Sequence, residues 1–317
     1  MVDFFSALLH GPVVGSRSPL LWLQIAAGVS VAVACGARTG LLVPEPMDAS
    51  DVVVAERDAR EEDVREEDAF TFADVAPDAQ CPAEATLIYI TGEGNQLWSF
   101  WPPAFQFTLI GTLNCLSGPT HMTVDRNGNA WVVAGGFIYR ASTTDATCQQ
   151  LPTWTTQTGF DDFALTFVGL TNTDTTLYLL SMTDLARFDI VMGTFTIIGA
   201  PNVPFSYGGD MTSNGDGNLY FLHDTTPRDL DELNPLNAQV INTYIVAAGA
   251  GDHDQALAYF GGLFYAFVNG VVYSYDVATM TTTMLGNAPI SVTGAGQSTC
   301  VPTSPTDAGA PDVSMPD

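Results

Sequence analysis

One unit of sequence occurs four times in this chain, and no other feature restricts its fold as strongly. Met122–Val133 and Met211–Leu222 each read as a strand, an Asn/Gly turn and a second strand that carries an aromatic residue. Val168–Leu180 has a longer turn, and Leu257–Phe267 has a shorter one. The copies start about 40–50 residues apart, a period that is typical of β-propeller blades.

Two more strands are predicted in each unit. The first unit, Ala85–Leu113, has no inner strand before it, and the last apolar segment, Ile290–Gly296, has no unit after it. Joining the two closes the ring and removes exposed sheet edges. The sequence therefore predicts an all-β, five-bladed β-propeller over residues 81–302, with the C-terminal strand closing the first blade. A six-bladed propeller is the alternative if the first unit contains another set of strands. The third strands are Leu97–Phe100, Phe137–Arg140, Leu185–Asp189, Asp229–Leu233 and Val272–Asp276, and the fourth strands are Phe107–Gly111, Cys148–Pro152, Phe195–Gly199, Val240–Tyr244 and Thr281–Gly286.

These repeats resemble known propellers. The turn pattern of Asp or Asn, Gly, Asn and an aromatic residue resembles that of NHL and gluconolactonase-type propellers. Residues 85–300 are similar to propeller lipoproteins of GC-rich Gram-negative bacteria, through Met122–Trp131 and Val292–Cys300. The resemblance implies a propeller fold and export, and it brings no activity with it. The channel metal set of gluconolactonases (Glu, Asn and Asp) does not map onto this chain residue by residue.

The N-terminal residues predict export. Pro19–Ala34 is an apolar run with Arg17 before it, which is typical of a signal peptide over residues 1–34 and is short for a membrane-spanning helix. Ala32–Cys35 resembles the lipobox of bacterial lipoproteins, which implies cleavage before Cys35 and lipidation of Cys35. Gly36 follows in place of Asp, which by the sorting habit of that family points to the outer membrane. The alternative is ordinary signal cleavage, which gives a secreted protein.

Charge is concentrated between the predicted signal and the propeller. The chain has 35 acidic and 9 basic residues, a formal net charge of −26, and residues 45–78 hold 13 of the acidic ones against three Arg. Such a segment repels itself, so residues 35–80 are predicted to be a disordered linker that spaces the domain from a membrane. Residues 303–317 are predicted to be a disordered tail. The acidic balance excludes nucleic acid as an expected partner.

Five cysteines are present, and four remain after Cys35 is assigned to lipidation, which suits an oxidising compartment. Cys81 precedes the first blade and Cys300 follows the closing strand, so the ring predicts that these two form a disulfide. Cys115 and Cys148 lie at the fourth strands of neighbouring blades and are predicted to pair. No Cys-x-x-Cys occurs, so the sequence indicates neither a zinc site nor a redox motif.

Ionisable residues recur where the predicted inner strands begin. When the blades are aligned on the second-strand aromatic residue, these positions converge at the mouth of the channel. There, histidine with carboxylates is a set that suits a divalent cation or a general base. The simpler interpretation is that Asp and His bind backbone groups at wet strand ends. The residues are His121, Asp161, Asp162, Asp210, His253 and Asp254.

Two functions follow from these patterns. The first is a binding or scaffold module of the cell envelope, membrane-anchored and recognising a protein or a glycan. The alternative is a metal-dependent, lactonase-like hydrolase at the channel mouth. A cluster of Trp98, Trp101, Phe105 and Phe107 is either an exposed binding patch or packing between blades. The sequence assigns no catalytic residue, and its only candidate cofactor is a divalent cation.

Overall fold

The structure is a computed structural model that describes residues 81–169, 176–204, 208–214, 217–249 and 255–304. The predicted signal peptide, Cys35, the acidic segment to residue 80, and the tail from residue 305 lie outside these ranges. His253 and Asp254 lie outside them as well. Within the described ranges there is no helix long and apolar enough to span a membrane.

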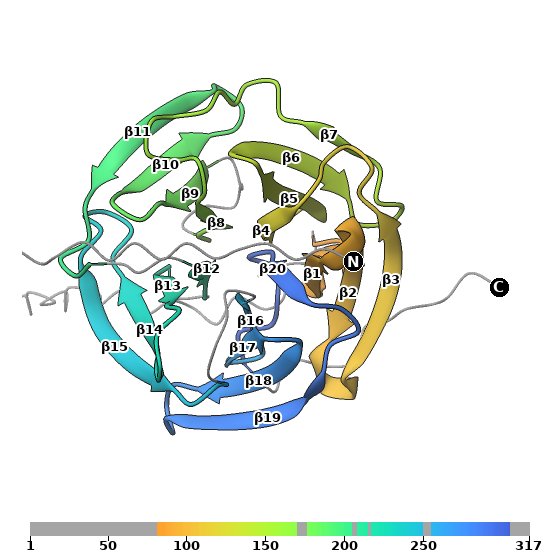
Figure 1. The fold of residues 1–317 in the computed structure, drawn as a ribbon, viewed down its shortest axis with the longest axis vertical. Helices are drawn as coiled ribbons and strands as arrows, with labels where there is room; N and C mark the ends of the chain where they lie inside the picture. Colours follow the sequence, from red (N-terminus) through yellow and green to blue (C-terminus); the bar gives the residue numbers. More distant parts are fainter. Residues whose placement is uncertain (1–80, 170–175, 205–207, 215–216, 250–254, 305–317) are drawn as a thin grey trace, which may run out of the picture. The chain divides into compact units, whose positions relative to one another are not determined.

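The described residues form five four-stranded antiparallel sheets, the blades of a propeller (Figure 1). Short 3-10 helices occur in blade 1 and just before it: η1 (Ala83–Thr86), η2 (Glu93–Asn95) and η3 (Pro102–Ala104). From the innermost strand outward, blade 1 is β20 (Val292–Gln297), β1 (Ile88–Gly92), β2 (Gln96–Trp101) and β3 (Gln106–Thr112); blade 2 is β4 (Pro119–Val124), β5 (Asn129–Ala134), β6 (Phe137–Ser142) and β7 (Cys148–Gln150); blade 3 is β8 (Ala164–Phe167), β9 (Thr176–Leu180), β10 (Leu185–Asp189) and β11 (Thr194–Gly199); blade 4 is β12 (Asp210–Ser213), β13 (Leu219–Leu222), β14 (Arg228–Leu233) and β15 (Val240–Val246); and blade 5 is β16 (Gln255–Phe260), β17 (Leu263–Val268), β18 (Val271–Asp276) and β19 (Thr281–Asn287).

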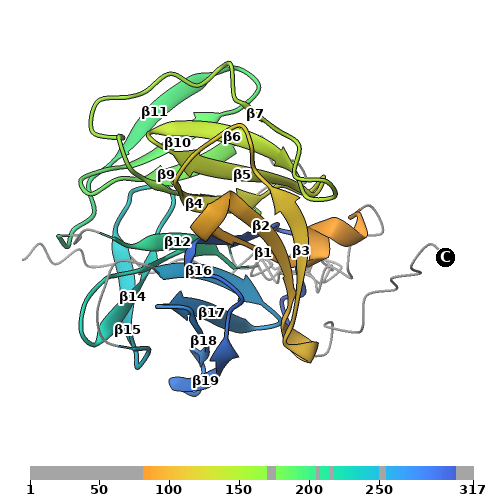
Figure 2. The ribbon, with the colours of Figure 1, turned by 45° about the vertical axis from the view of Figure 1, so that its right-hand side comes forward.

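The C-terminal strand closes the ring. β20 pairs with β1, with Ile88 opposite Gln297 and Ile90 opposite Ala295. The innermost strands contact one another in the cyclic order β20, β4, β8, β12, β16 and back to β20, which Figures 1 and 2 show as a ring of sheets around a common axis. The prediction of five blades with a C-terminal closing strand is confirmed.

Two glycines let the closing strand approach its neighbour. A Cβ atom on Gly296 would lie 2.5 Å from the Met122 carbonyl oxygen and from the Thr123 Cα of β4. A Cβ atom on Gly294 would lie 2.9 Å from the carbonyl carbon of His121. Because these neighbours are backbone atoms of a paired strand, any side chain at either position would push β20 away from β4.

The hairpins between the third and fourth strands share a local rule. The last residue of the third strand carries a side-chain acceptor, and the residue four positions later has positive φ. The acceptors bind backbone N–H groups within the turn; Asp189 Oδ1, for example, accepts from Met192 N at 2.8 Å. This pairing of an Asx-type turn with a left-handed residue reverses the chain without loss of backbone hydrogen bonds. The pairs are Ser142 with Ala146, Asp189 with Gly193, Asn234 with Ala238, and Asp276 with Met280.

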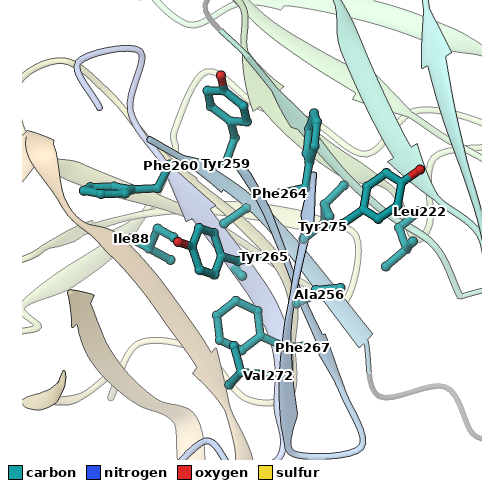
Figure 3. Packing of buried hydrophobic residues seen from close by; sticks show 14 of the residues in the cluster. Ile88, Leu222, Ala256, Tyr259, Phe260, Phe264, Tyr265, Phe267, Val272 and Tyr275 are labelled. Carbon is teal, nitrogen blue, oxygen red and sulfur yellow. The ribbon is translucent and has the colours of Figure 1, made fainter. Parts of the chain in front are cut away.

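The core lies between the blades. Phe100 of blade 1 stacks on Phe107 at 4.3 Å between ring centroids, and it meets Phe267 of blade 5 edge to face at 5.9 Å. Trp101 meets Phe260 of blade 5 at 5.2 Å. Figure 3 shows part of this cluster, with Phe260 and Phe267 among side chains between the sheets of blades 1 and 5. Trp98 and Phe105 pack against the same cluster, so the aromatic group is packing between blades rather than a binding patch.

Both predicted disulfides are present. Cys81 and Cys300 are bonded, with their Cα atoms 6.1 Å apart and 219 residues between them in sequence. Cys115 and Cys148 join blades 1 and 2, with their Cα atoms 5.8 Å apart.

Candidate functional site

The channel mouth is formed where the inner strands begin. His121 lies near the start of β4, Asp210 is the first residue of β12, and Asp161 and Asp162 lie in the loop that leads into β8. The propeller brings these residues from blades 2, 3 and 4 to one face. The equivalent loop of blade 5 includes His253 and Asp254, which are outside the described residues.

His121 lies between two carboxylates. Its Nδ1 atom is 3.0 Å from Asp210 Oδ1, and its Nε2 atom is 3.5 Å from Asp162 Oδ1. Asp210 is fully buried, whereas about half of the Asp162 side chain is exposed (51%). Both ring nitrogens therefore face acceptors, an arrangement that the doubly protonated imidazolium satisfies.

Asp210 ties three blades together. Its Oδ1 atom also accepts from Met211 N at 3.0 Å, and its Oδ2 atom accepts from Leu257 N of β16 at 2.9 Å. A buried carboxylate is stable only when such donors replace its water. Asp210 therefore has a structural role in joining the inner strands, besides facing His121.

The electrostatics favour a charged histidine. Burial lowers the pKa of His121, but the hydrogen bonds to Asp162 and Asp210 outweigh it and raise that pKa from 6.5 to about 9. The hydrogen bond from His121 lowers the pKa of Asp162. Burial raises the pKa of Asp210, and the hydrogen bond and charge of His121 act against that rise. At neutral pH His121 is an imidazolium, which can donate protons but has no lone pair for a metal ion or for a proton.

A pocket of ≈ 360 Å³ opens beside His121. Its rim includes Asp161 and Asp162, both exposed, and the hydroxyl-bearing Thr183. Phe163 and Phe221 contribute to its walls. The site thus combines an acidic rim with an aromatic interior. Among the residues that the structure describes, no group of three or more His, Cys, Asp or Glu side chains is arranged to hold a metal ion.

A second layer of residues, which the sequence analysis missed, supports this pocket. The Gln255 side chain donates to the carbonyl oxygen of Gly208 and accepts from Arg228 Nη1, and Arg228 Nη1 also donates to Asp224 Oδ1 at 2.8 Å. Gly209 lies on the ring of Phe221, where a Cβ atom would be 1.7 Å from Cζ. The only sequence signal was the glycine pair directly before Asp210.

The far end of the channel is crossed by Gln297, the last residue of β20. Its amide nitrogen donates to Ser213 O at 3.0 Å and to Thr212 Oγ1 at 2.7 Å, while its amide oxygen accepts from Tyr259 N at 3.0 Å. One side chain of blade 1 thereby bridges blades 4 and 5. The mouth pocket lies at the opposite end, where the inner strands begin.

Comparisons with known proteins give the fold alone. No family model and no curated protein matches the chain. Similar solved structures include a nidogen/laminin complex (14% identity, TM-score 0.45, covering 68% of this chain and 81% of that one). Others are a streptogramin B lyase (12%, TM-score 0.40, covering 65% and 66%) and the Pan2 WD40 domain of Neurospora crassa (11%, TM-score 0.38, covering 65% and 66%). At these values the similarities carry no argument about function.

Proposed function

We propose that the chain is an exported, membrane-anchored binding module whose mouth pocket receives a positively charged group of a partner protein. The observation that carries this is the rim of the pocket, where Asp161 and Asp162 are exposed above an aromatic interior. The signal-like N-terminus, Cys35 and the acidic segment support delivery to the outer membrane, with a secreted form as the alternative.

The charge of the pocket selects the ligand class. Three carboxyl groups, those of Asp161, Asp162 and Asp210, surround one imidazolium, and no described arginine lines the pocket. An ammonium or guanidinium group would find a half-exposed carboxylate in Asp162, and its aliphatic stem would contact Phe163 and Phe221. The acidity of the whole chain would steer such a partner toward it.

We expect the full chain to bind Nα-acetyl-lysine methylamide and Nα-acetyl-arginine methylamide, and to ignore the glutamine analogue. Asp162→Asn should weaken binding about tenfold or more, because it removes a charged hydrogen-bond acceptor. Asp145→Asn, on a distant hairpin of blade 2, is the matched control and should bind like the wild type. NMR titration measures all of these affinities. Equal binding by Asp162→Asn, or tighter binding of neutral sugars, would contradict a cation-binding pocket.

The hydrolase alternative makes a different prediction. A metal-dependent hydrolase requires His121 to give up one carboxylate and present a nitrogen to the metal. Stoichiometric metal in the purified protein, with lactone hydrolysis lost in His121→Gln, would replace the binding module by an enzyme.

The anchor is tested at Cys35. Cells fed a radiolabelled or alkyne fatty acid should label the wild-type chain and leave Cys35→Ser unlabelled. The wild type should be found in the outer-membrane fraction, and the variant in the soluble envelope fraction, because several acyl chains give stable attachment. Absence of label on the wild type would favour the secreted form.

A further inference from the structure

A second pocket lies on the side of the propeller, between blades 2 and 3. It has a volume of ≈ 440 Å³, within the range usual for small-ligand sites. Blade 2 contributes Arg140 of β6 and residues of and after β7, and blade 3 contributes Ile190 and Val191, directly after β10. We call it the side groove, and it is separate from the mouth pocket, with which it shares no lining residue.

Arg140 is held in the side groove by a neutral group. Its Nη2 atom donates to Asn129 Oδ1 at 2.9 Å. The Asn129 amide nitrogen in turn donates to both carboxylate oxygens of Asp125, each at 3.0 Å, so the Asn129 oxygen must face the arginine. Asp125 also accepts from Asn127 N and from Trp131 Nε1. This chain of contacts fixes the guanidinium group and uses one of its five N–H donors.

The guanidinium group lacks a direct counter-ion. Among the described residues, no carboxylate lies within the 4.0 Å ion-pair distance of Arg140. The chain has only 9 basic residues against 35 acidic ones, so an exposed arginine held by an amide is unusual here. Planar carboxylates are the groups that a fixed guanidinium binds best, through two parallel hydrogen bonds.

The other walls indicate what carries that carboxylate. Asn127, Gln149 and Gln150 are exposed amides, each with donors and an acceptor side by side, which suits neighbouring hydroxyl groups. Val191 is 67% exposed, and with Ile190 it gives an apolar strip for the C–H face of a ring. Hydroxyls, one carboxylate and an apolar ring face together describe a uronic acid.

We infer that the side groove binds a uronic-acid-containing saccharide of one or two rings, with its carboxylate on Arg140. This site is independent of the mouth pocket, so its success or failure does not decide the function proposed above.

The test compares one sugar with and without its charge. The full chain is titrated with digalacturonate and with its dimethyl ester, followed by NMR or calorimetry. We expect the acid to bind at least tenfold more tightly than the ester, and Arg140→Gln to lose this preference. Arg140→Lys should recover part of the affinity, because one charge returns without the two-pronged geometry.

Arg187→Gln is the matched control, because Arg187 lies opposite Tyr178 on β10 as Arg140 lies opposite Trp131 on β6, yet it does not line the side groove. It should bind the acid like the wild type, and so should Asp162→Asn of the mouth pocket. Equal binding of acid and ester, unchanged binding by a folded Arg140→Gln, or no binding by the wild type would each overturn the inference.

Discussion

Replacing Gly296 by valine should prevent stable closure of the ring. A Cβ atom there would lie 2.5 Å from two backbone atoms of β4, and neither can move without displacing a strand of blade 2. Overpacking of this kind costs about 1–3 kcal/mol when side chains can adjust and more when backbone must shift. We expect a loss of about 4 kcal/mol or more in the free energy of unfolding, measured by urea denaturation followed by circular dichroism.

Gly249→Ala is the control for this experiment. An added Cβ there would meet its nearest atoms at 3.4 Å, the edge of ordinary van der Waals contact. Its urea midpoint should stay close to that of the wild type. A Gly296→Val protein with an unchanged midpoint would mean that β20 does not approach β4 this closely.

The second large effect is on the pH dependence of stability. The folded-state pKa of His121, about 9, lies above the unfolded value of 6.5, so the imidazolium stabilises the fold. That stabilisation is fully present below about pH 6.5, declines above it, and is lost as pH rises through about 9. The wild type should therefore lose about 3 kcal/mol of unfolding free energy between pH 6 and pH 10.

His121→Gln should remove most of this slope. The variant should be less stable at pH 6, because Asp210 then lacks its cation, and the two proteins should converge toward pH 10. Tyr89 and Tyr265 do not confuse the comparison, since burial raises the pKa of each to about 12. Parallel stability curves for the two proteins would show that His121 does not carry a stabilising charge.

The fold was predictable because its signals are local and repeat. The turn at Asp125 is one example: its carboxylate accepts backbone N–H groups from Asn127 and Asn129, so each residue type in the unit has a direct local reason. Ring closure followed from a strand deficit at one end and a surplus at the other. The hairpin rule at Ser142 and Asp276 went unnoticed, because Ser and Asp share an acceptor role that letter-by-letter comparison does not reveal.

The mouth was predictable in part. Counting back from the second-strand aromatic residues located His121, Asp162 and Asp210, because strand register converts equal spacing into one shared face. Sequence did not indicate that His121 uses both nitrogens on carboxylates, since that depends on the distance between blades. Gln255 and Gln297 were missed because a neutral amide has no distinctive pattern until its partners in other blades are known.

The bond between Cys81 and Cys300 has a mechanical consequence. If the chain is held at Cys35, tension along the segment from 36 to 80 reaches the domain at Cys81, where it divides between β1 and, across the sulfur bridge, β20. These two strands pair with each other, so neither can be peeled off alone by pulling at that point. The load is carried by covalent bonds past the closure of the ring, and the propeller withstands traction from its tether as a unit.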